Sequence, residues 1–219
     1  MKKIIVLLSI VMLFMSGCSV TKLDSEDVGK NIKTLLSTDN NLFNVFYDGY
    51  KYYLPKGTGF VSRDDYNAII KDANGNRYYL YVDVISYYEK HKNTYQESKK
   101  SHYSRILNYN NKTGYIQIDE KGSKYFIQFV YNYAKIEALI PKDDLTDSIN
   151  NMCYILRSIK FNRKVIESMI GEDTLDYKEQ NYSLFKDDSK SENFLGVVEK
   201  YETDDYKKDL EDEKIDLNN

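Results

Sequence analysis

The residue types that could carry out chemistry are few and widely spaced in this chain. Its two histidines are His91 and His102, and its two cysteines are Cys18 and Cys153. A zinc site needs three or four ligands from His, Cys or carboxylates. Two histidines eleven residues apart in the polar segment 88–104 do not supply them. We therefore expect both histidines to be solvated surface residues, and the sequence predicts no metal site.

The remaining candidates for catalysis are equally isolated. Cys153 lies in an apolar run with helical spacing and has no obvious histidine partner, so we expect a buried structural thiol rather than a nucleophile. The pairs Asp64-Asp65 and Asp143-Asp144 fall in predicted turns, where aspartates shape the turn or cap a helix. No glycine-rich loop precedes a predicted helix, and no Gly-x-Ser-x-Gly motif occurs. The sequence predicts no catalytic residue, no cofactor and no enzymatic activity.

Tyrosines are the residues best suited to contact a ligand or partner, and the chain has 22 of them. A tyrosine offers an apolar ring and a polar tip to a partner surface. Such an exposed aromatic face could comprise Tyr52, Tyr53, Tyr79, Tyr81, Tyr87 and Tyr88. The alternative, which the β propensity of tyrosine favours, is that they are half-buried strand residues.

The first 18 residues form a pattern that concerns export rather than catalysis. Lys2-Lys3 precedes the apolar run Ile4–Met15, whose 12 residues are too few to span a bilayer, which needs about 20. Met15-Ser16-Gly17-Cys18 follows and resembles the lipobox of bacterial lipoproteins, with Met in place of the usual Leu. The resemblance implies that a signal peptidase cuts between Gly17 and Cys18, and that the Cys18 thiol carries a diacylglyceryl lipid.

This resemblance implies that the mature chain sits on the outer face of the cell membrane, held by lipid on Cys18. The alternative is an ordinary cleaved signal peptide followed by an incidental cysteine. The whole chain also resembles uncharacterised lipoproteins of low-GC Gram-positive bacteria, which implies a location and no activity. Because lipid would consume Cys18, Cys153 would have no partner for an intramolecular disulfide.

Charge divides the chain into a nearly neutral part and an acidic end. Residues 187–219 hold 12 acidic and 5 basic residues, whereas residues 18–186 hold 24 basic and 22 acidic residues. Neither part has the concentrated basic face of a nucleic-acid-binding protein. We expect a signal peptide over 1–17, a tether over 18–27, one α+β domain over 28–186 and a disordered acidic tail over 187–219.

Helical spacing predicts three helices in that domain. Val28–Ser37 and Lys164–Ile170 are short, and Gly171 ends the second. The clearest helix follows Pro141, with Asp144 as its cap. Its apolar residues recur every three or four positions: Leu145, Ile149, Met152, Leu156 and Ile159.

Turn residues and alternation predict a series of hairpins. The turns are Asp48-Gly49, Asn74-Gly75, Asn110-Asn111-Lys112 and Lys121-Gly122. The expected strands are Phe43–Tyr47, Tyr50–Leu54, Tyr66–Lys71, Arg77–Tyr87, Ser104–Tyr109, Thr113–Glu120, Lys124–Ile140 and, at an edge, Tyr177–Phe185. Within Arg77–Tyr87 the alternation assigns Tyr78, Leu80, Val82 and Val84 to the core face. The sum is an α+β fold, in which a meandering antiparallel sheet of about five to seven strands packs against helices.

Two motif groups resemble PsbP-like domains. Tyr47-Asp48-Gly49-Tyr50 with Leu54-Pro55-Lys56-Gly57 is similar to their opening hairpin, and Ser158-Ile159-Lys160-Phe161 is similar to their ending. The resemblance covers about Phe43–Asn162. It implies an α-β-α sandwich and an accessory, non-enzymatic role, and no binding residue carries over from it.

Three hypotheses about function follow from the sequence. We expect a membrane-anchored, non-enzymatic lipoprotein that binds or scaffolds an envelope protein. The first alternative is a small-ligand-binding lipoprotein with a pocket of at least about 300 Å³ between sheet and helix. The second is a cryptic hydrolase, which would gather polar residues with shifted pKa values in one cleft.

Overall fold

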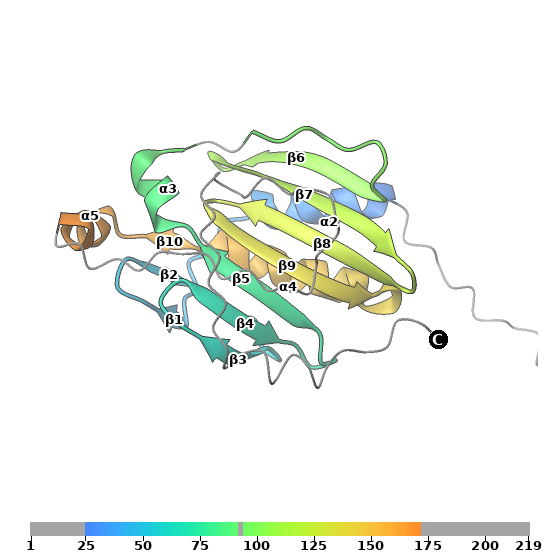
Figure 1. Ribbon diagram of the computed structural model, residues 1–219, viewed down its shortest axis with the longest axis horizontal. Coiled ribbons are helices and arrows are strands. Elements are labelled where there is room, and N and C mark those ends of the chain that lie inside the picture. The colour runs from blue at the N-terminus through green and yellow to red at the C-terminus, as the bar shows by residue number, and fades with distance from the viewer. Residues whose placement is uncertain (1–24, 92–93, 172–219) are drawn as a thin grey trace, which may run out of the picture.

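The computed structural model describes residues 25–91 and 94–171. An open, seven-stranded antiparallel sheet carries helices α2 (Ser25–Ser37) and α4 (Leu145–Ser158) on one face, and a small three-stranded sheet lies beside it (Figure 1). This architecture confirms the predicted α+β fold with its meandering antiparallel sheet. No helix within the two described ranges is long and apolar enough to cross a bilayer.

The seven-stranded sheet has the order β3-β4-β5-β9-β8-β7-β6, and every neighbouring pair is antiparallel. Its strands are β3 (Gly59–Arg63), β4 (Asn67–Lys71), β5 (Arg77–Val82), β6 (Tyr103–Tyr109), β7 (Lys112–Lys121), β8 (Lys124–Tyr131) and β9 (Ala134–Pro141). Strands β6 to β9 follow one another in the chain through tight turns. The turns between β6 and β7 and between β7 and β8 are the local signals that made this part of the meander predictable.

Helix α4 supplies the centre of the core. The predicted apolar stripe is confirmed, because the side chains at positions 145, 149, 152, 156 and 159 are at most 2% exposed. They pack against β8 and β9, whose inward side chains, such as Ile127 and Ile136, are fully buried. Helix α2 buries Val28, Ile32 and Leu36 beside α4, as the spacing predicts.

The predicted strand Arg77–Tyr87 is wrong beyond Val82. Strand β5 ends there, and helix α3 (Val84–Glu89) begins. The cause is Asp83, whose carboxylate accepts hydrogen bonds from Ser86 N at 2.8 Å and Ser86 Oγ at 3.0 Å and so caps the helix. The alternation of side chains along Arg77–Tyr87 indicated a strand, so the helix cap at Asp83 was not predicted.

The predicted single strand Lys124–Ile140 is also wrong, because it is a hairpin of β8 and β9. The chain reverses at Asn132 and Tyr133, whose φ angles are +53° and +60°. Left-handed φ angles are tolerated by Asn, but they are unusual for Tyr, so Asn-Tyr carries no strong turn signal. The hydrogen bond from Asn132 N to Thr113 O, 3.1 Å, ties this turn to β7.

The hairpin at Asp48-Gly49 is confirmed, but it belongs to a separate small sheet. Its strands are short, β1 (Val45–Phe46) and β2 (Tyr50–Tyr52), and β2 also pairs with β10 (Lys160–Phe161). Neither β10 nor the edge strand β3 was predicted from the sequence, since a two-residue strand and a strand following Gly57 show no clear alternation. Helix α5 (Arg163–Gly171) confirms the last predicted helix.

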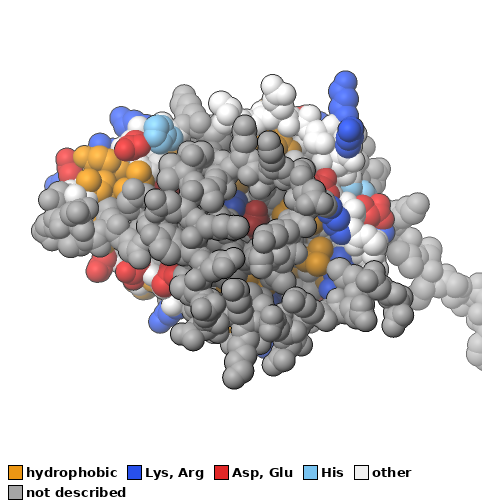
Figure 2. All heavy atoms as spheres, in the orientation of Figure 1, with side chains coloured by type: hydrophobic (Ala, Val, Ile, Leu, Met, Phe, Trp, Pro, Cys, Tyr) orange, Lys and Arg blue, Asp and Glu red, His pale blue; other side chains and the backbone are white. Residues whose placement is uncertain are grey.

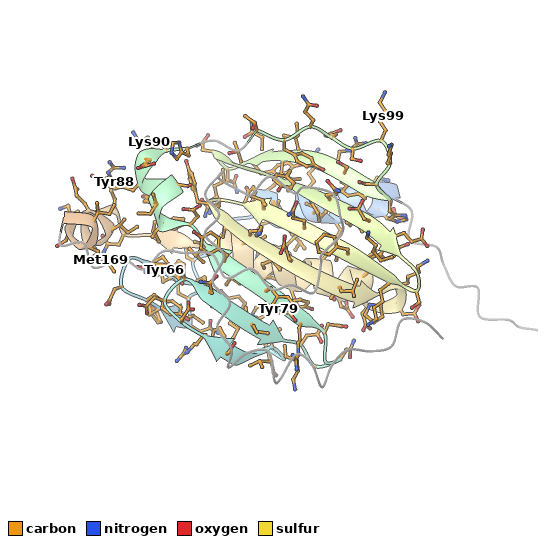
Figure 3. The ribbon with its side chains drawn as sticks, viewed as in Figure 1. Tyr66, Tyr79, Tyr88, Lys90, Lys99 and Met169 are labelled. Atoms are coloured by element: carbon orange, nitrogen blue, oxygen red, sulfur yellow. The ribbon has the colours of Figure 1, made fainter. Side chains whose placement is uncertain are left out.

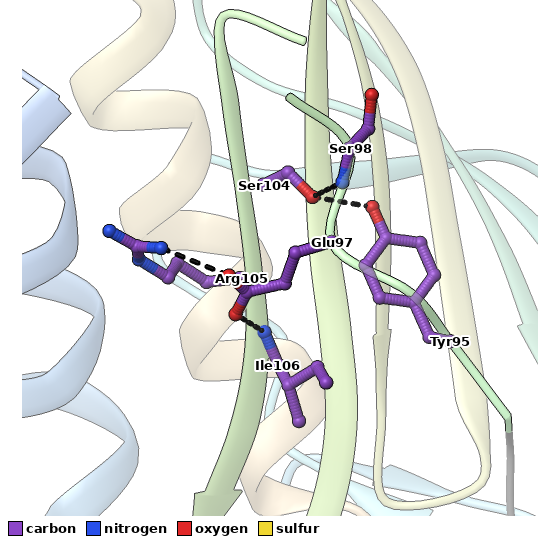
Figure 4. Close-up of polar contacts among 6 residues, drawn as sticks. All are labelled: Tyr95, Glu97, Ser98, Ser104, Arg105 and Ile106. Carbon is purple, nitrogen blue, oxygen red and sulfur yellow. Dashed lines mark hydrogen bonds and ion pairs between the residues drawn. The ribbon is translucent and has the colours of Figure 1, made fainter. Parts of the chain in front are cut away.

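Strand β6 is an edge strand of the large sheet, and the preceding segment covers its outer side (Figure 4). Glu97 Oε1 accepts a hydrogen bond from Ile106 N at 2.9 Å, and Arg105 Nη1 donates to Glu97 Oε2 at 3.0 Å. Ser104 Oγ accepts a hydrogen bond from Ser98 N at 2.8 Å. These contacts occupy an edge amide that another strand could otherwise bind.

Candidate functional site

Helices α2 and α4 end close together, and a pocket of about 500 Å³ opens where they do. We term it the helix-end pocket. Its walls come from the chain after α2, the turn between β6 and β7, the end of β8, the end of α4, strand β10 and one residue of α3. The residues that decide its chemistry are Asp39, Phe43, Tyr87, Lys112, Arg157, Lys160 and Phe161.

Two cationic side chains are placed by the helix ends themselves. The last carbonyl groups of a helix lack partners and carry partial negative charge. Arg157 Nη1 donates to Leu35 O at 2.6 Å and to Thr38 O at 3.3 Å, at the end of α2. Lys112 Nζ donates to Arg157 O at 2.7 Å, at the end of α4. The two helix ends therefore draw Arg157 and Lys112 into the same pocket.

Two asparagines complete this framework. Asn110 Nδ2 donates to Leu36 O at 3.2 Å, and Asn132 Nδ2 donates to Ile159 O at 2.8 Å. Both asparagines occupy hairpin turns with positive φ, 49° and 53°, a conformation that Asn tolerates better than most residues. The turns of the sheet thus position side chains that hold the helix ends.

Positive charge predominates in the pocket. Lys112, Arg157 and Lys160 line it, and among the described residues the carboxylate of Asp39 is the one acidic group in its wall. Burial lowers the pKa of Lys112, and the charges of Lys160 and Arg157 lower it further, whereas Asp39 opposes the shift. The Nε atom of Arg157 is buried and has no hydrogen-bond partner in the described part of the chain. The pocket therefore has excess positive charge.

Part of the pocket wall is aromatic. The rings of Tyr87 and Phe161 stack with their centroids 4.1 Å apart, and Lys160 Nζ lies 5.9 Å from the centroid of the Phe43 ring. Apolar walls with a few polar groups are typical of small-molecule sites. This arrangement can hold a small anion that has an apolar portion.

The six tyrosines proposed as an exposed face do not form one. Tyr52, Tyr79 and Tyr81 are buried, at 0%, 8% and 6% exposure. Tyr79 lies on β5 of the large sheet, whereas Tyr88 belongs to helix α3 (Figure 3). Tyr53, Tyr87 and Tyr88 are half-buried. Of the six, Tyr87 lines the helix-end pocket.

The histidines are solvated and far apart. In Figure 2 their pale blue side chains lie at opposite sides of the visible face, and Figure 3 shows the same separation for the neighbouring residues Lys90 and Lys99. His91 Nε2 lies 2.7 Å from Glu89 Oε2 on the surface. No group of three or more His, Cys, Asp or Glu residues in the described ranges could hold a metal ion.

The other candidates have structural roles. Cys153 is fully buried in the core, and burial raises the pKa of its thiol, so the thiolate is disfavoured. Asp64 shapes its turn, because Oδ1 accepts hydrogen bonds from Tyr66 N at 3.0 Å and Asn67 N at 2.6 Å. Asp144 occupies the predicted cap position of α4, but its carboxylate accepts hydrogen bonds from Asn74 and Asn76 instead of a helix amide.

The lipidation and cleavage residues, Cys18 and Gly17, lie outside the described residues, as do the predicted strand Tyr177–Phe185 and the acidic tail. The pocket residues Lys112, Arg157 and Lys160 were not identified as a site from the sequence. They are separated by up to 48 residues and match no motif, so their proximity could not be read from the chain.

No protein-family model matches this chain, and no curated protein or solved structure was found to be similar to it.

Proposed function

We propose that this protein is a lipid-anchored, extracytoplasmic binding protein without catalytic activity, and that the helix-end pocket binds a small anionic molecule. One observation carries the assignment of the ligand. Three cationic side chains of the described residues, Lys112, Arg157 and Lys160, line one pocket, against the carboxylate of Asp39. Its volume of about 500 Å³ suits a small molecule.

A phosphate or carboxylate group suits the chemistry of this pocket. An anion would stabilise the charged form of Lys112, whose pKa is lowered by burial. It would also be attracted by the positive charge of Arg157, which lines the pocket. The aromatic wall of Tyr87 and Phe161 would contact an apolar part of the ligand.

A non-catalytic role is supported by the placement of the other titratable groups with shifted pKa values. Burial raises the pKa of the Asp83 carboxyl, but that carboxylate is occupied as the cap of α3. The Cys153 thiol is enclosed in the core. Neither group lines the helix-end pocket, so neither can act on a ligand bound there.

The pocket assignment can be tested with inorganic phosphate and glycerol 3-phosphate as probes, using isothermal titration calorimetry on the full chain. Lys112→Met should weaken binding about tenfold, whereas Lys112→Arg keeps the charge and should change it by less than about threefold. Lys56→Met is the matched control, because it removes an exposed lysine outside the pocket. Equal affinity in Lys112→Met and Lys56→Met would refute the assignment.

The anchor can be tested separately. Cys18→Ala should abolish metabolic labelling with a fatty acid and move the protein from the detergent phase to the aqueous phase. The physical reason is that two acyl chains bury many CH₂ groups, at about 0.8 kcal/mol each. Cys153→Ala is the control and should remain labelled. Unchanged labelling of Cys18→Ala would exclude the lipobox.

The described geometry supports ligand binding more strongly than scaffolding of an envelope protein, the role that the sequence favours. The observation that bears on scaffolding is that four large apolar side chains of the described residues are highly exposed: Leu42, Phe46, Val61 and Ile106. Affinity capture of the native lipoprotein from membranes tests the scaffolding role. A single stoichiometric envelope protein that stays bound to Lys112→Met would favour scaffolding over the pocket.

A further inference from the structure

The three-stranded sheet has one buried face and one exposed face. Lys51 on β2 pairs with Phe46 on β1 and with Lys160 on β10, so the three side chains project from the same face. The alternate residues of β2, Tyr50 and Tyr52, point the other way and are buried. Phe46 is 67% exposed, which is unusual for so large an apolar side chain.

Phe43, which precedes β1, extends this face. Its ring centroid lies 4.3 Å from Lys51 Nζ and 5.9 Å from Lys160 Nζ. These four residues, Phe43, Phe46, Lys51 and Lys160, are termed the aromatic–lysine face. Lysines directly opposite each other on neighbouring strands repel, and neither Lys51 nor Lys160 forms an ion pair with a described residue.

We infer that the aromatic–lysine face docks on an anionic lipid bilayer. Exposed aromatic and aliphatic side chains enter the headgroup region of a bilayer, while lysine ammonium groups stay at the level of the lipid phosphates. Phe46 suits the first role, and Lys51 and Lys160 suit the second. An anionic surface also relieves the repulsion between the two lysines, since its negative potential attracts each of them.

Positive charge continues from this face into the helix-end pocket. The pocket shares Phe43 and Lys160 with the face and adds Lys112 and Arg157. Lys160 is close enough to Lys112 to lower the pKa of Lys112. The basic surface is therefore broader than the small sheet, and its charge is complementary to that of acidic lipid headgroups.

The choice of a bilayer as the anionic partner rests on the proposed lipid anchor. Ser25, at the start of α2, is seven residues from Cys18, and seven residues reach at most about 25 Å. The 13 residues of α2 rise about 20 Å, and Phe43 follows the end of the helix. A tether longer than the helix lets the aromatic–lysine face reach the membrane to which the chain is anchored.

The chain has no tryptophan, so Phe46→Trp introduces a unique fluorescent reporter on this face. The full chain would be mixed with vesicles of phosphatidylcholine alone or with about 30% phosphatidylglycerol, which supplies the negative surface potential, each with brominated acyl chains. In anionic vesicles we expect a blue shift and at least twofold quenching. We expect little quenching in neutral vesicles, or when Lys51→Glu is added. Val61→Trp is the control, since Val61 is exposed on β3 and should not be quenched.

The outcomes separate this inference from the proposed function. Mass spectrometry of the same samples reports whether Cys18 carries lipid, and Lys112→Met, which leaves the residues of the aromatic–lysine face unchanged, should reduce the quenching of the Phe46→Trp variant less than Lys51→Glu does. Equal quenching of the Phe46→Trp and Val61→Trp variants in anionic vesicles would overturn the inference. Insensitivity of the Phe46→Trp signal to Lys51→Glu would also overturn it. Either result would assign the exposed Phe46 to a protein partner instead.

Discussion

At the scale of single residues, Tyr78 shows how buried polar groups connect distant elements. Its hydroxyl donates to Asp72 Oδ2 at 2.5 Å and lies 3.2 Å from Ser148 Oγ on α4. Asn76 Nδ2 donates to Asp72 Oδ2 at 3.0 Å and to Asp144 Oδ2 at 2.9 Å. The network joins the turn after β4 to the start of α4, and burial raises the pKa of Tyr78.

We predict that Tyr78→Phe lowers the free energy of unfolding by about 1–3 kcal/mol, because it leaves the buried Asp72 carboxylate short of one donor. Urea denaturation monitored by circular dichroism measures the change. Tyr53→Phe is the control, since Tyr53 is half-buried and its hydroxyl makes no hydrogen bond with a described residue; its effect should stay within about 0.5 kcal/mol. Equal effects of the two variants would remove the structural role assigned to Tyr78.

Glu97 gives a pH-dependent contact on the edge strand β6. Its hydrogen bond from Ile106 N, assisted by Arg105, lowers the pKa of the Glu97 carboxyl below its ordinary value of 4.5. A lowered pKa in the folded state adds stability above the unfolded-state pKa, and this is lost as pH falls through the folded value. We predict that Glu97→Gln lowers the Tm slightly at pH 7 and that this difference shrinks as the pH falls through the lowered pKa of Glu97.

Thermal unfolding of the parent and Glu97→Gln between about pH 7 and pH 3 measures this difference. Lys99→Gln, a change to an exposed neighbouring side chain, is the control and should show no such trend. A difference in Tm that grows as the pH falls would contradict the assigned role of Glu97.

At the scale of elements, the pairing of β7 with β8 depends on a glycine. A Cβ atom at Gly114 would lie 2.7 Å from Tyr131 Cα and would also collide with Val130 O, both of which belong to the β8 backbone. Because backbone atoms cannot move aside as a flexible side chain can, the two strands would have to separate locally. Gly114 therefore sets how closely β7 and β8 approach each other.

We predict that Gly114→Ala costs about 1–3 kcal/mol of folding free energy or more. Gly59→Ala is the matched control on the edge strand β3, where a Cβ atom would meet nothing within 4 Å. Chemical denaturation should separate the two variants clearly. If Gly114→Ala proved as stable as Gly59→Ala, the close approach of β7 and β8 would not hold in solution.

At the scale of the whole molecule, charge is distributed unevenly along the chain. The predicted tail 187–219 carries 12 acidic and 5 basic residues, with large apolar residues scattered among them. Such a composition buries too little surface to offset the entropy of ordering the chain. We predict that truncation after Lys186 changes the Tm by less than about 2 °C, measured by differential scanning calorimetry against the full chain. A larger loss would mean that the tail belongs to the fold.

The sequence alone determined features that local chemistry dictates. The apolar stripe of α4 follows from a period of 3.6 residues, and the hairpins at Asp48-Gly49 and Asn74-Gly75 follow from the φ angles that glycine permits. The lipidation of Cys18 is likewise inferred from a linear motif, the lipobox, and it stays a prediction. The turn at Asn132-Tyr133 and the helix cap at Asp83 were not predicted, because their local sequence signals are weak.

Only the tertiary structure decided where the candidate site lies. Lys112 and Arg157 meet because two helix ends with partial negative charge pack side by side, and each draws a cation from another element. Lys51 and Lys160 meet because β10 returns to pair with β2 across more than a hundred residues. Periodicity reports which face of an element is buried but not which other element covers it. For that reason, the contacts that assemble the helix-end pocket and the aromatic–lysine face could not be predicted from the sequence.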